Sequence, residues 1–542
     1  MDRSELERSQ QVIGTDWEQA FHRFENVIAC GNEILQVRAA IKLAHLANHA
    51  PESILAGAIP ILVKLLGSPF SGSSSLSIQE AVAFCLKCIT CQGEGKLAVV
   101  VGQSGAIPSL LKLLPHSEGR LQKVLLKCLR NMVTFADANC IIVVENGGLE
   151  VILNMFSASS DGLRRFLLEI FSALALLREV RRVIISLGSL PFLVESARFG
   201  SMISRTRAAQ AIGLLGLVRR ARRMLIDSGS IPVLIELLRV GDLSTKLVAG
   251  NALGVISSHV DYIRPVAQAG AIPLYVELIQ GPEPMGKEIA EDVFCILAVA
   301  EANAVTIAEH LVRVLKGGDD GAKAAAADVL WDLSGYKHAS FVVRNSGAIP
   351  VLVELLRHGS VDIREKVSGA VSQLSYHGAD RVALADAGAI PLLLDTLDDE
   401  SEEVRDNAAE ALASFSEDPL LHDRVSDGFS MSGFQNMRGV MIQAHDSNVH
   451  LVRSLRQMSI DQLTWDPGDL PGGKGTWDQV PGGKGTRDQI KISTDCFAIS
   501  LEYQVGSSSL ASNLEANYDV GKPIALHCIV SSWFRDQVCR VN

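Results

Sequence analysis

Three cysteines spaced three residues apart, Cys85, Cys88 and Cys91, are the residues in this chain whose type and spacing best fit metal chemistry. Thiolates are zinc ligands, but a structural zinc site needs four ligands, and neither a further cysteine nor a pair of histidines follows at a suitable spacing. The apolar residues around them predict a helix, in which cysteine acts as a small apolar side chain. We therefore expect buried thiols and no metal site.

A second candidate for chemistry is the lysine of a repeated Gly-Gly-Lys-Gly-Thr segment, Lys474 and Lys484. A phosphate-binding loop requires the order Gly-x4-Gly-Lys-Ser/Thr followed by a helix, and both features are missing. The histidines are dispersed, and no Ser-His-Asp or paired-carboxylate arrangement has a glycine-rich elbow beside it. The sequence thus predicts a protein that is not an enzyme and has no cofactor.

The elements that position the side chains are defined by a repeated marker, Gly-small-Ile-Pro followed by an apolar helix. Most successive copies lie 41 residues apart. A period in the forties built from helices is the signature of a helical solenoid, in which each repeat packs on its neighbours. The marker begins at Gly57, Gly105, Gly188, Gly229, Gly270, Gly347 and Gly388, a worn copy begins at Gly147, and Thr306 occupies the glycine position of a decayed copy.

Each repeat is expected to contain three helices. In the copy at Gly229, a short first helix ends at the glycine, and Pro232 lies in the first turn of the second helix, where a missing amide donor costs little. The third helix is predicted over 243–257. Hydrophobic residues make up 48% of the chain and aromatic residues only 5%, so the interior must consist mainly of aliphatic side chains that suit closely packed helices.

Three helices per repeat, with the marker between the first and the second, closely resemble the armadillo repeat family over about 35–413. The array is similar to the repeat region of plant U-box proteins, although residues 1–34 have no U-box. The resemblance implies an all-α, right-handed α-solenoid, the armadillo superhelix. We expect a helical N-terminal cap over 1–34, armadillo repeats over 35–426, an irregular terminal repeat or cap over 427–463, and a Gly-rich tail over 464–542 that is disordered or marginally β.

Charge and composition limit the cellular locations and the kinds of partner that we expect. A net charge of −11 argues against a general nucleic-acid binder, and no uninterrupted apolar run reaches the roughly 18 to 20 residues that span a bilayer. Ten scattered cysteines without a secretory signal favour a reduced compartment. We expect a cytoplasmic and/or nuclear protein that binds protein partners, without nucleic-acid binding or membrane insertion.

The resemblance also implies where a partner would bind. Armadillo proteins bind extended peptides in a groove lined by third helices, and in the family's nuclear-import receptors a ladder of asparagines binds the peptide backbone while tryptophans stack on its side chains. Of the nine equivalent positions here only Asn131 is an asparagine, and Trp331 is the single tryptophan near this line. Both are candidate partner-binding residues, but the broken ladder disfavours a nuclear transport receptor. The equivalent positions are Cys88, Asn131, Ala173, Leu214, Val255, Ile296, Asp332, Gln373 and Ser414.

A second periodicity is basic, since a lysine or arginine occurs 17 residues after each of seven successive markers. Such a row could pair with neighbouring acids or cap the end of the preceding helix, or it could bind acidic segments of a partner. Both interpretations stay open. The seven residues are Arg164, Arg205, Lys246, Lys287, Lys323, Arg364 and Arg405.

A third basic set lies in the first helices. The range 178–223 has a net charge of +8, whereas the range 395–427 has a net charge of −10. Opposite charges at separate places on one chain favour oriented docking, and self-association is a further alternative. The candidate residues are Arg181, Arg182, Arg222, Arg223 and Arg264.

These observations lead to one functional prediction and two alternatives. We predict a non-catalytic scaffold or adaptor that binds an extended or helical partner segment, acidic or helical in character, along the third helices. The first alternative is a substrate-recognition subunit of a ubiquitin ligase acting in trans. The second is a nuclear transport receptor.

Overall fold

In the computed structural model, residues 16–68, 73–335 and 337–426 are described, and all their regular structure is helical. These residues form two compact units, with the division between Ser230 and Ile231. The predicted all-α fold of repeated helices is confirmed in both. The terminal repeat expected over 427–463 and the tail expected over 464–542 lie outside the described residues.

Unit 1 covers residues 16–230. It begins with a helix in the region expected to form a cap, and three-helix repeats follow. Its helices are α2 Trp17–Ala29, α3 Glu33–Leu46, α4 Glu52–Leu66, α5 Ser73–Thr90, η1 Gln92–Gly95, α6 Lys96–Val101, η2 Gly102–Ala106, α7 Ile107–Leu113, η3 Leu114–His116, α8 Gly119–Phe135, α9 Asp137–Glu145, α10 Gly148–Ala158, α11 Asp161–Leu174, α12 Arg178–Ser186, α13 Leu190–Arg198, α14 Met202–Gly216 and α15 Arg219–Asp227.

Unit 2 covers residues 231–426. Its helices are α16 Ser230–Val240, whose first residue belongs to unit 1, α17 Leu243–Ser257, α18 Val260–Gln268, α19 Ala271–Gln280, α20 Pro284–Leu297, α21 Glu301–Gly317, α22 Asp320–Ser334, α23 Lys337–Asn345, α24 Ala348–His358, α25 Val361–Ser375, α26 Gly378–Asp386, α27 Ala389–Asp395, η4 Thr396–Asp398 and α28 Glu402–Ser416.

The marker glycines form the corner between first and second helices. Seven of them adopt a positive φ, between 71° and 88°. This left-handed conformation costs an L-residue roughly 1–2 kcal/mol and costs glycine almost nothing, so glycine ends one helix and lets the next begin at once. The seven are Gly105, Gly147, Gly188, Gly229, Gly270, Gly347 and Gly388.

Two marker positions do not break the helix. Thr306 lies inside α21, a single helix of 17 residues in which the first and second helices are joined. A β-branched residue cannot adopt the left-handed turn cheaply, so the helix continues through it. Gly57 lies inside α4, and a Cβ built there would be 3.2 Å from the ring of Phe21, so at this position glycine serves the packing of α2 on α4.

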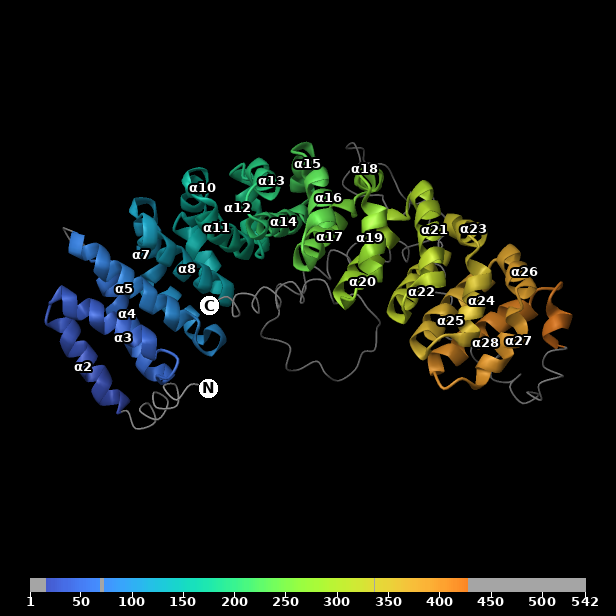
Figure 1. Ribbon diagram of the computed structural model, residues 1–542, viewed down its shortest axis with the longest axis horizontal. Helices are drawn as coiled ribbons and strands as arrows, with labels where there is room; N and C mark the ends of the chain where they lie inside the picture. Colours follow the sequence, from blue (N-terminus) through green and yellow to red (C-terminus); the bar gives the residue numbers. More distant parts are fainter. Residues whose placement is uncertain (1–15, 69–72, 336, 427–542) are drawn as a thin grey trace, which may run out of the picture. The chain divides into compact units, whose positions relative to one another are not determined.

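Third helices pack against third helices. In unit 1, α5 contacts α8, α8 contacts α11, and α11 contacts α14. In unit 2, α17, α20, α22, α25 and α28 form the equivalent series, and Figure 1 shows the last four following one another along one edge of the unit. Several third helices begin with a side-chain cap, as where the carboxylate of Asp242 accepts a hydrogen bond from the amide of Thr245 at 2.8 Å. Each unit thus presents a continuous third-helix face.

Replacing a marker glycine by alanine should destabilise unit 1 through the backbone alone. Gly188 has φ +71°, and a Cβ added to it would meet no atom within 4 Å, so Gly188→Ala should cost about 1–2 kcal/mol of conformational energy and lower the thermal midpoint. Gly162 lies in α11, has equal space and lacks the positive φ, so Gly162→Ala should be neutral or stabilise by up to about 1 kcal/mol. Thermal unfolding followed by circular dichroism compares the two, and equal midpoints would contradict the role of the turn.

Candidate functional site on the third-helix faces

Five of the seven residues of the basic row contact the chain itself at the turns before the third helices. In unit 1, Nη2 of Arg164 donates to the carbonyl of Ser159 at 3.3 Å, and Nε of Arg205 donates to the carbonyl of Ala197 at 2.9 Å. These carbonyls lie at the end of the preceding second helix, where the last carbonyl groups have no amide donor within the helix. A cation there is favourable for hydrogen bonding and for the helix dipole.

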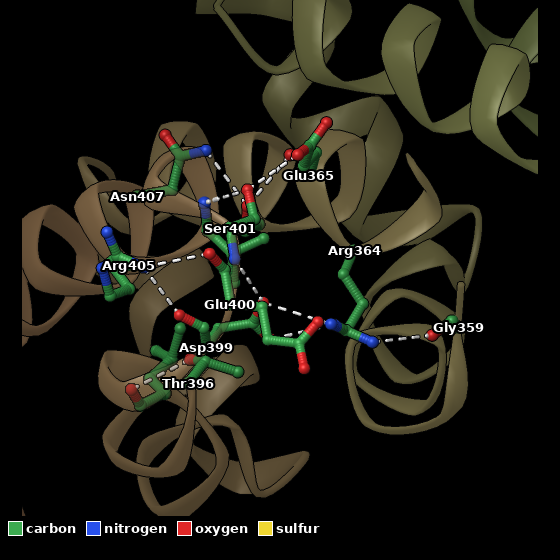
Figure 2. Close-up of polar contacts among 12 residues, drawn as sticks. Gly359, Arg364, Glu365, Thr396, Asp399, Glu400, Ser401, Arg405 and Asn407 are labelled. Carbon is green, nitrogen blue, oxygen red and sulfur yellow. Dashed lines mark hydrogen bonds and ion pairs between the residues drawn. The ribbon is translucent and has the colours of Figure 1, made fainter. Parts of the chain in front are cut away.

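In unit 2 the basic row contacts the equivalent turns, which precede the third helices of that unit. Figure 2 shows Arg364 between two groups: Nη1 donates to the carbonyl of Gly359 at 3.2 Å, and Nε and Nη2 donate to the carboxylate of Asp399 at 2.9 and 3.1 Å. Nη1 of Arg405 donates to the carbonyls of Asp399 and Glu400 at 2.8 and 3.1 Å (Figure 2). Partial burial alone would raise the pKa of Asp399, but hydrogen bonds from Arg364 and from the Ser401 amide outweigh it, and the pKa is lowered.

The three lysines of the row differ from one another. Nζ of Lys287 donates to the carbonyl of Ile279 at 2.7 Å, as the arginines do. Nζ of Lys246 lies 3.5 Å from the carboxylate of Glu277. Within the described residues, the side chain of Lys323 has neither kind of contact. Capping of the preceding helix is therefore what most of the row does in both units, and binding of a partner by these residues stays a prediction.

The first-helix arginines divide into two sets. Arg181 is buried and donates to the carbonyl of Leu176 at 3.1 Å, and Arg222 donates to the carbonyl of Gly216 at 2.9 Å, so both stabilise the end of the preceding third helix. The other three arginines of the set are exposed: Arg182, Arg223 and Arg264. These three are the members of the set that a partner in solution could reach.

Asn131, the one residue that matches the asparagine ladder, is fully buried in α8. Its side-chain oxygen accepts hydrogen bonds from Nε and Nη2 of Arg130 at 3.1 and 2.7 Å. Its Nδ2 donates to the carbonyl of Lys87 at 3.3 Å and to Sγ of Cys91 at 2.8 Å, which joins α8 to α5. The side chain therefore contributes to packing between two third helices, and its partner-binding role is untested.

Arg130 leads to a buried charge network that sequence reasoning missed. The carboxylate of Glu169 lies 3.3 Å from Nη1 of Arg130, 3.8 Å from Nε of Arg165 and 3.6 Å from Nε of Arg207. The side chains of Glu169, Arg130 and Arg207 are exposed by only 6%, 3% and 9%. The only signal in the sequence was Glu169 itself, a charge inside an otherwise apolar run.

Trp331 lies half-buried on α22 in unit 2 and is packed by residues of the same unit. Nζ of Lys366 lies 5.6 Å from its ring centroid and 3.3 Å from the carboxylate of Asp328. A Cβ at Gly369 would come within 2.5 Å of the indole, so glycine allows α25 to approach the ring. The ring thus already contacts a cation of its own chain.

The cysteines on α5 have a neighbour that spacing did not indicate. Burial raises the pKa of the Cys85 thiol, with Cys88 and Cys128 as further causes, so Cys128 of α8 belongs to the same cluster. Cys85 and Cys128 are buried, whereas Cys88 and Cys91 are half-buried. In the described part of the chain, no group of three or more His, Cys, Asp or Glu side chains is arranged to bind a metal.

Like charges gather on the third-helix face of each unit, with opposite signs. In unit 1, partial burial lowers the pKa of Lys127 on α8, and Lys87 and Lys123 lower it further. In unit 2, desolvation raises the pKa of Asp292 on α20 to about 6, with Glu288 and Asp332 as the next causes. Burial is the largest cause of both shifts, and no opposite charge stands among the further causes of either.

One stretch in the described residues, Lys96–His116, is long and apolar enough to cross a membrane by length and composition, and half of it is buried in the unit. A bent pair, Asp137–Glu145 with Gly148–Phe156, passes the same test only if it counts as one span. Core helices of soluble proteins meet the same criteria, so this is weak evidence. The absence of membrane insertion stays a prediction.

Comparison with known proteins agrees with this architecture. The model of the armadillo/beta-catenin-like repeat matches residues 219–258 and 338–376, and the HEAT repeat model matches residues 389–418. No curated protein matches the chain. The crystal structure of an engineered protein is similar with a TM-score of 0.61 and 22% identity, and the match covers 73% of this chain and 98% of that one. A second engineered protein has 26% identity and a TM-score of 0.36, with 42% of this chain and 99% of its own covered.

The fold therefore defines the class, which is the all-α helical-repeat proteins, whose repeats pack on their neighbours. Within this class, residues 219–258 and 338–376 match armadillo-type repeats and residues 389–418 match a HEAT-type repeat, so the armadillo repeats predicted from the sequence are confirmed. Such solenoids are typically non-catalytic scaffolds that bind other proteins. The particular similarity to plant U-box proteins stays a prediction.

Removing the central carboxylate of the buried network should destabilise unit 1. Glu169→Gln leaves Arg130 and Arg207 buried without a counter-charge, and breaking a buried ion pair typically costs about 3–5 kcal/mol. We expect a loss of about 3 kcal/mol, measured as a lower thermal midpoint. Glu179→Gln, an exposed position on α12, is the control and should change stability by less than about 0.5 kcal/mol. Equal midpoints for wild type and Glu169→Gln would contradict the network.

The raised pKa of Asp292 gives a pH-dependent effect on unit 2. The folded chain binds this proton up to about pH 6, whereas the unfolded chain releases it at about pH 4. The carboxylate therefore destabilises the fold, with no effect below about pH 4, a growing effect from about pH 4 to 6, and the full effect above. Asp292→Asn should raise stability by about 1 kcal/mol at neutral pH, after allowance for solvent screening, and by nothing at about pH 4.

Thermal unfolding of wild type and Asp292→Asn across this pH range measures the effect. Asp406→Asn on α28 is a matched control, since its exposed carboxylate makes no hydrogen bond or ion pair within the described residues. A gain for Asp292→Asn that has the same size in acid and at neutral pH would contradict desolvation of the carboxylate as its cause.

Proposed function

We propose that this protein is a non-catalytic scaffold or adaptor that binds extended or helical segments of partner proteins on its third-helix faces. The observation that carries the proposal is the crowding of like charges there, positive around Lys127 in unit 1 and negative around Asp292 in unit 2. Like charges side by side destabilise a folded chain, and a partner of opposite charge would relieve that cost.

The helical-repeat architecture supports this proposal. Successive third helices contact one another in each unit, so a segment crossing them can meet several helices in turn. Much of the basic row binds carbonyls of the chain, which leaves the charges nearer the middle of the third helices for a partner. Lys123 on α8 and Asp292 on α20 are such charges. Both residues are exposed, although the atoms around the Asp292 carboxylate partly desolvate it.

The experiment is a map of amide protection by bound partners. The full chain is used to capture crosslinked partners from cell extract, and hydrogen exchange of the purified complex is compared with that of the free chain. We expect added protection in third helices such as Gly119–Phe135 or Asp320–Ser334, and none in first helices such as Arg178–Ser186 or Val260–Gln268. Protection confined to first helices would contradict the proposal.

The same experiment addresses the ubiquitin-ligase alternative. A ubiquitin-conjugating enzyme or a ligase among the captured proteins would favour a substrate-recognition subunit acting in trans. Binding to third helices without either enzyme would favour a scaffold of another kind.

A further inference from the structure

We propose that the third-helix face of unit 1 binds an extended acidic segment of a partner protein through a lysine cluster formed by Lys87, Lys123 and Lys127. This rests on the proposed function and names the partner chemistry for one of the two faces. The three lysines come from two adjacent helices, since Lys87 lies in the last turn of α5 and the other two lie on α8, which packs against α5.

The cluster is cationic and has no carboxylate partner in the described part of the chain, and Nζ of Lys127 lies 5.5 Å from the centroid of the Phe166 ring. Lys123 and Lys127 are one turn apart on α8, an arrangement in which like charges repel. Besides partial burial, the causes that lower the pKa of Lys127 are all cations: Lys87, Lys123, Arg130 and Arg165. No anion of the described residues acts on this lysine strongly enough to offset them.

The carboxylates of Glu80 on α5 and Glu169 on α11 are already paired with arginines. Glu169 is shared by three arginines from α8, α11 and α14, and Glu80 of α5 lies 2.6 Å from Nε of Arg120. Helix α8 itself carries Arg120, Lys123, Lys127 and Arg130 and has no acidic residue. The three lysines therefore have no ion pair in the described part of unit 1, and an external anion is the partner that their charge fits.

The geometry favours an extended protein segment over other anions. Packed helices lie about 8–10 Å apart. An extended chain in the polyproline II conformation advances about 3.1 Å per residue with three residues per turn, so carboxylates three residues apart lie on one side of it and match lysines on successive helices. Lysines bind as point charges and do not need the paired oxygens of a phosphate. A long nucleic acid would need a continuous basic surface, whereas Arg205 and Arg207 of α14 are bound to Ala197 and Glu169.

The test uses the full chain and a fluorescein-labelled peptide of four Glu-Gly-Ser triplets, with the Gln-Gly-Ser peptide as its control. Fluorescence anisotropy should show binding of the glutamate peptide that weakens as salt rises from about 50 to about 300 mM. Lys123→Glu/Lys127→Glu should weaken binding by about tenfold or more. The matched control is Arg219→Glu/Arg220→Glu on α15, an exposed pair on a first helix of the same unit, which changes net charge equally and should alter affinity by less than about twofold.

A second variant separates binding from folding. Lys123→Gln/Lys127→Gln removes the repulsion along α8, so its thermal midpoint should stay the same or rise while its affinity for the glutamate peptide falls. An unchanged affinity in both lysine variants overturns the proposal. Equal losses in the lysine variant and in the first-helix control also overturn it, because binding would then follow net charge alone.

Three further outcomes are decisive. An oligonucleotide of equal charge that binds the same lysines about tenfold tighter than the peptide would assign the cluster to polyanions and overturn the proposal. Salt-sensitive self-association that Glu402→Lys/Glu403→Lys abolishes would make a second copy the occupant, with the same consequence. Captured partners that protect α20 and α22 but not α5 and α8 would contradict the lysine cluster and leave the proposed function in place.

Discussion

The left-handed turn at the marker glycine is the backbone constraint on which seven of the described repeats depend. The chain must leave a first helix and enter a second helix at once, and a positive φ makes this possible without a loop. Gly270 and Gly347 show the geometry with φ of 88° and 77°, and in both cases the second helix begins at the next residue. The second helix in turn positions the carbonyls that the basic row binds. The place where the third helix starts is therefore also set by the glycine turn.

The decayed repeat shows how far this constraint reaches. Thr306 joins two helices into α21, yet α22 still contacts both α20 and α25. Within the described residues, Lys323, the basic-row residue of this repeat, does not make the contact with a preceding carbonyl that Lys287 makes in the repeat before it. The series of third helices is thus maintained by contacts between the third helices themselves, and the glycine corner decides only how the chain reaches each of them. A repeat protein with local contacts tolerates such a change because each repeat packs on its neighbours alone.

Periodicity predicted the fold because many helix boundaries have a local chemical cause, a marker glycine or a capping side chain, whereas the candidate site depends on contacts that the sequence does not show. The third helix expected over 243–257 is α17 with those bounds, since Asp242 caps its start. In contrast, Glu169 pairs with Arg130 and Arg207, each nearly one repeat away, so neither pairing has a local signal. Asn131 matched a family position, yet its hydrogen bonds connect α8 to α5 inside the unit. Residue type at an equivalent position therefore does not establish an equivalent role, because the partners of the side chain decide it.

The opposite charges of the two third-helix faces require an explanation beyond stability. A single acidic residue on α8 would relieve the repulsion around Lys127, and a single basic residue near α20 would relieve that around Asp292. The chain shows elsewhere that it can place such pairs, as between Lys366 and Asp328 on neighbouring third helices. The net charge of −11 does not reveal this division, because it sums over both faces. Departures from local compensation are expected where a surface serves binding, because the missing counter-charge is then supplied by the partner.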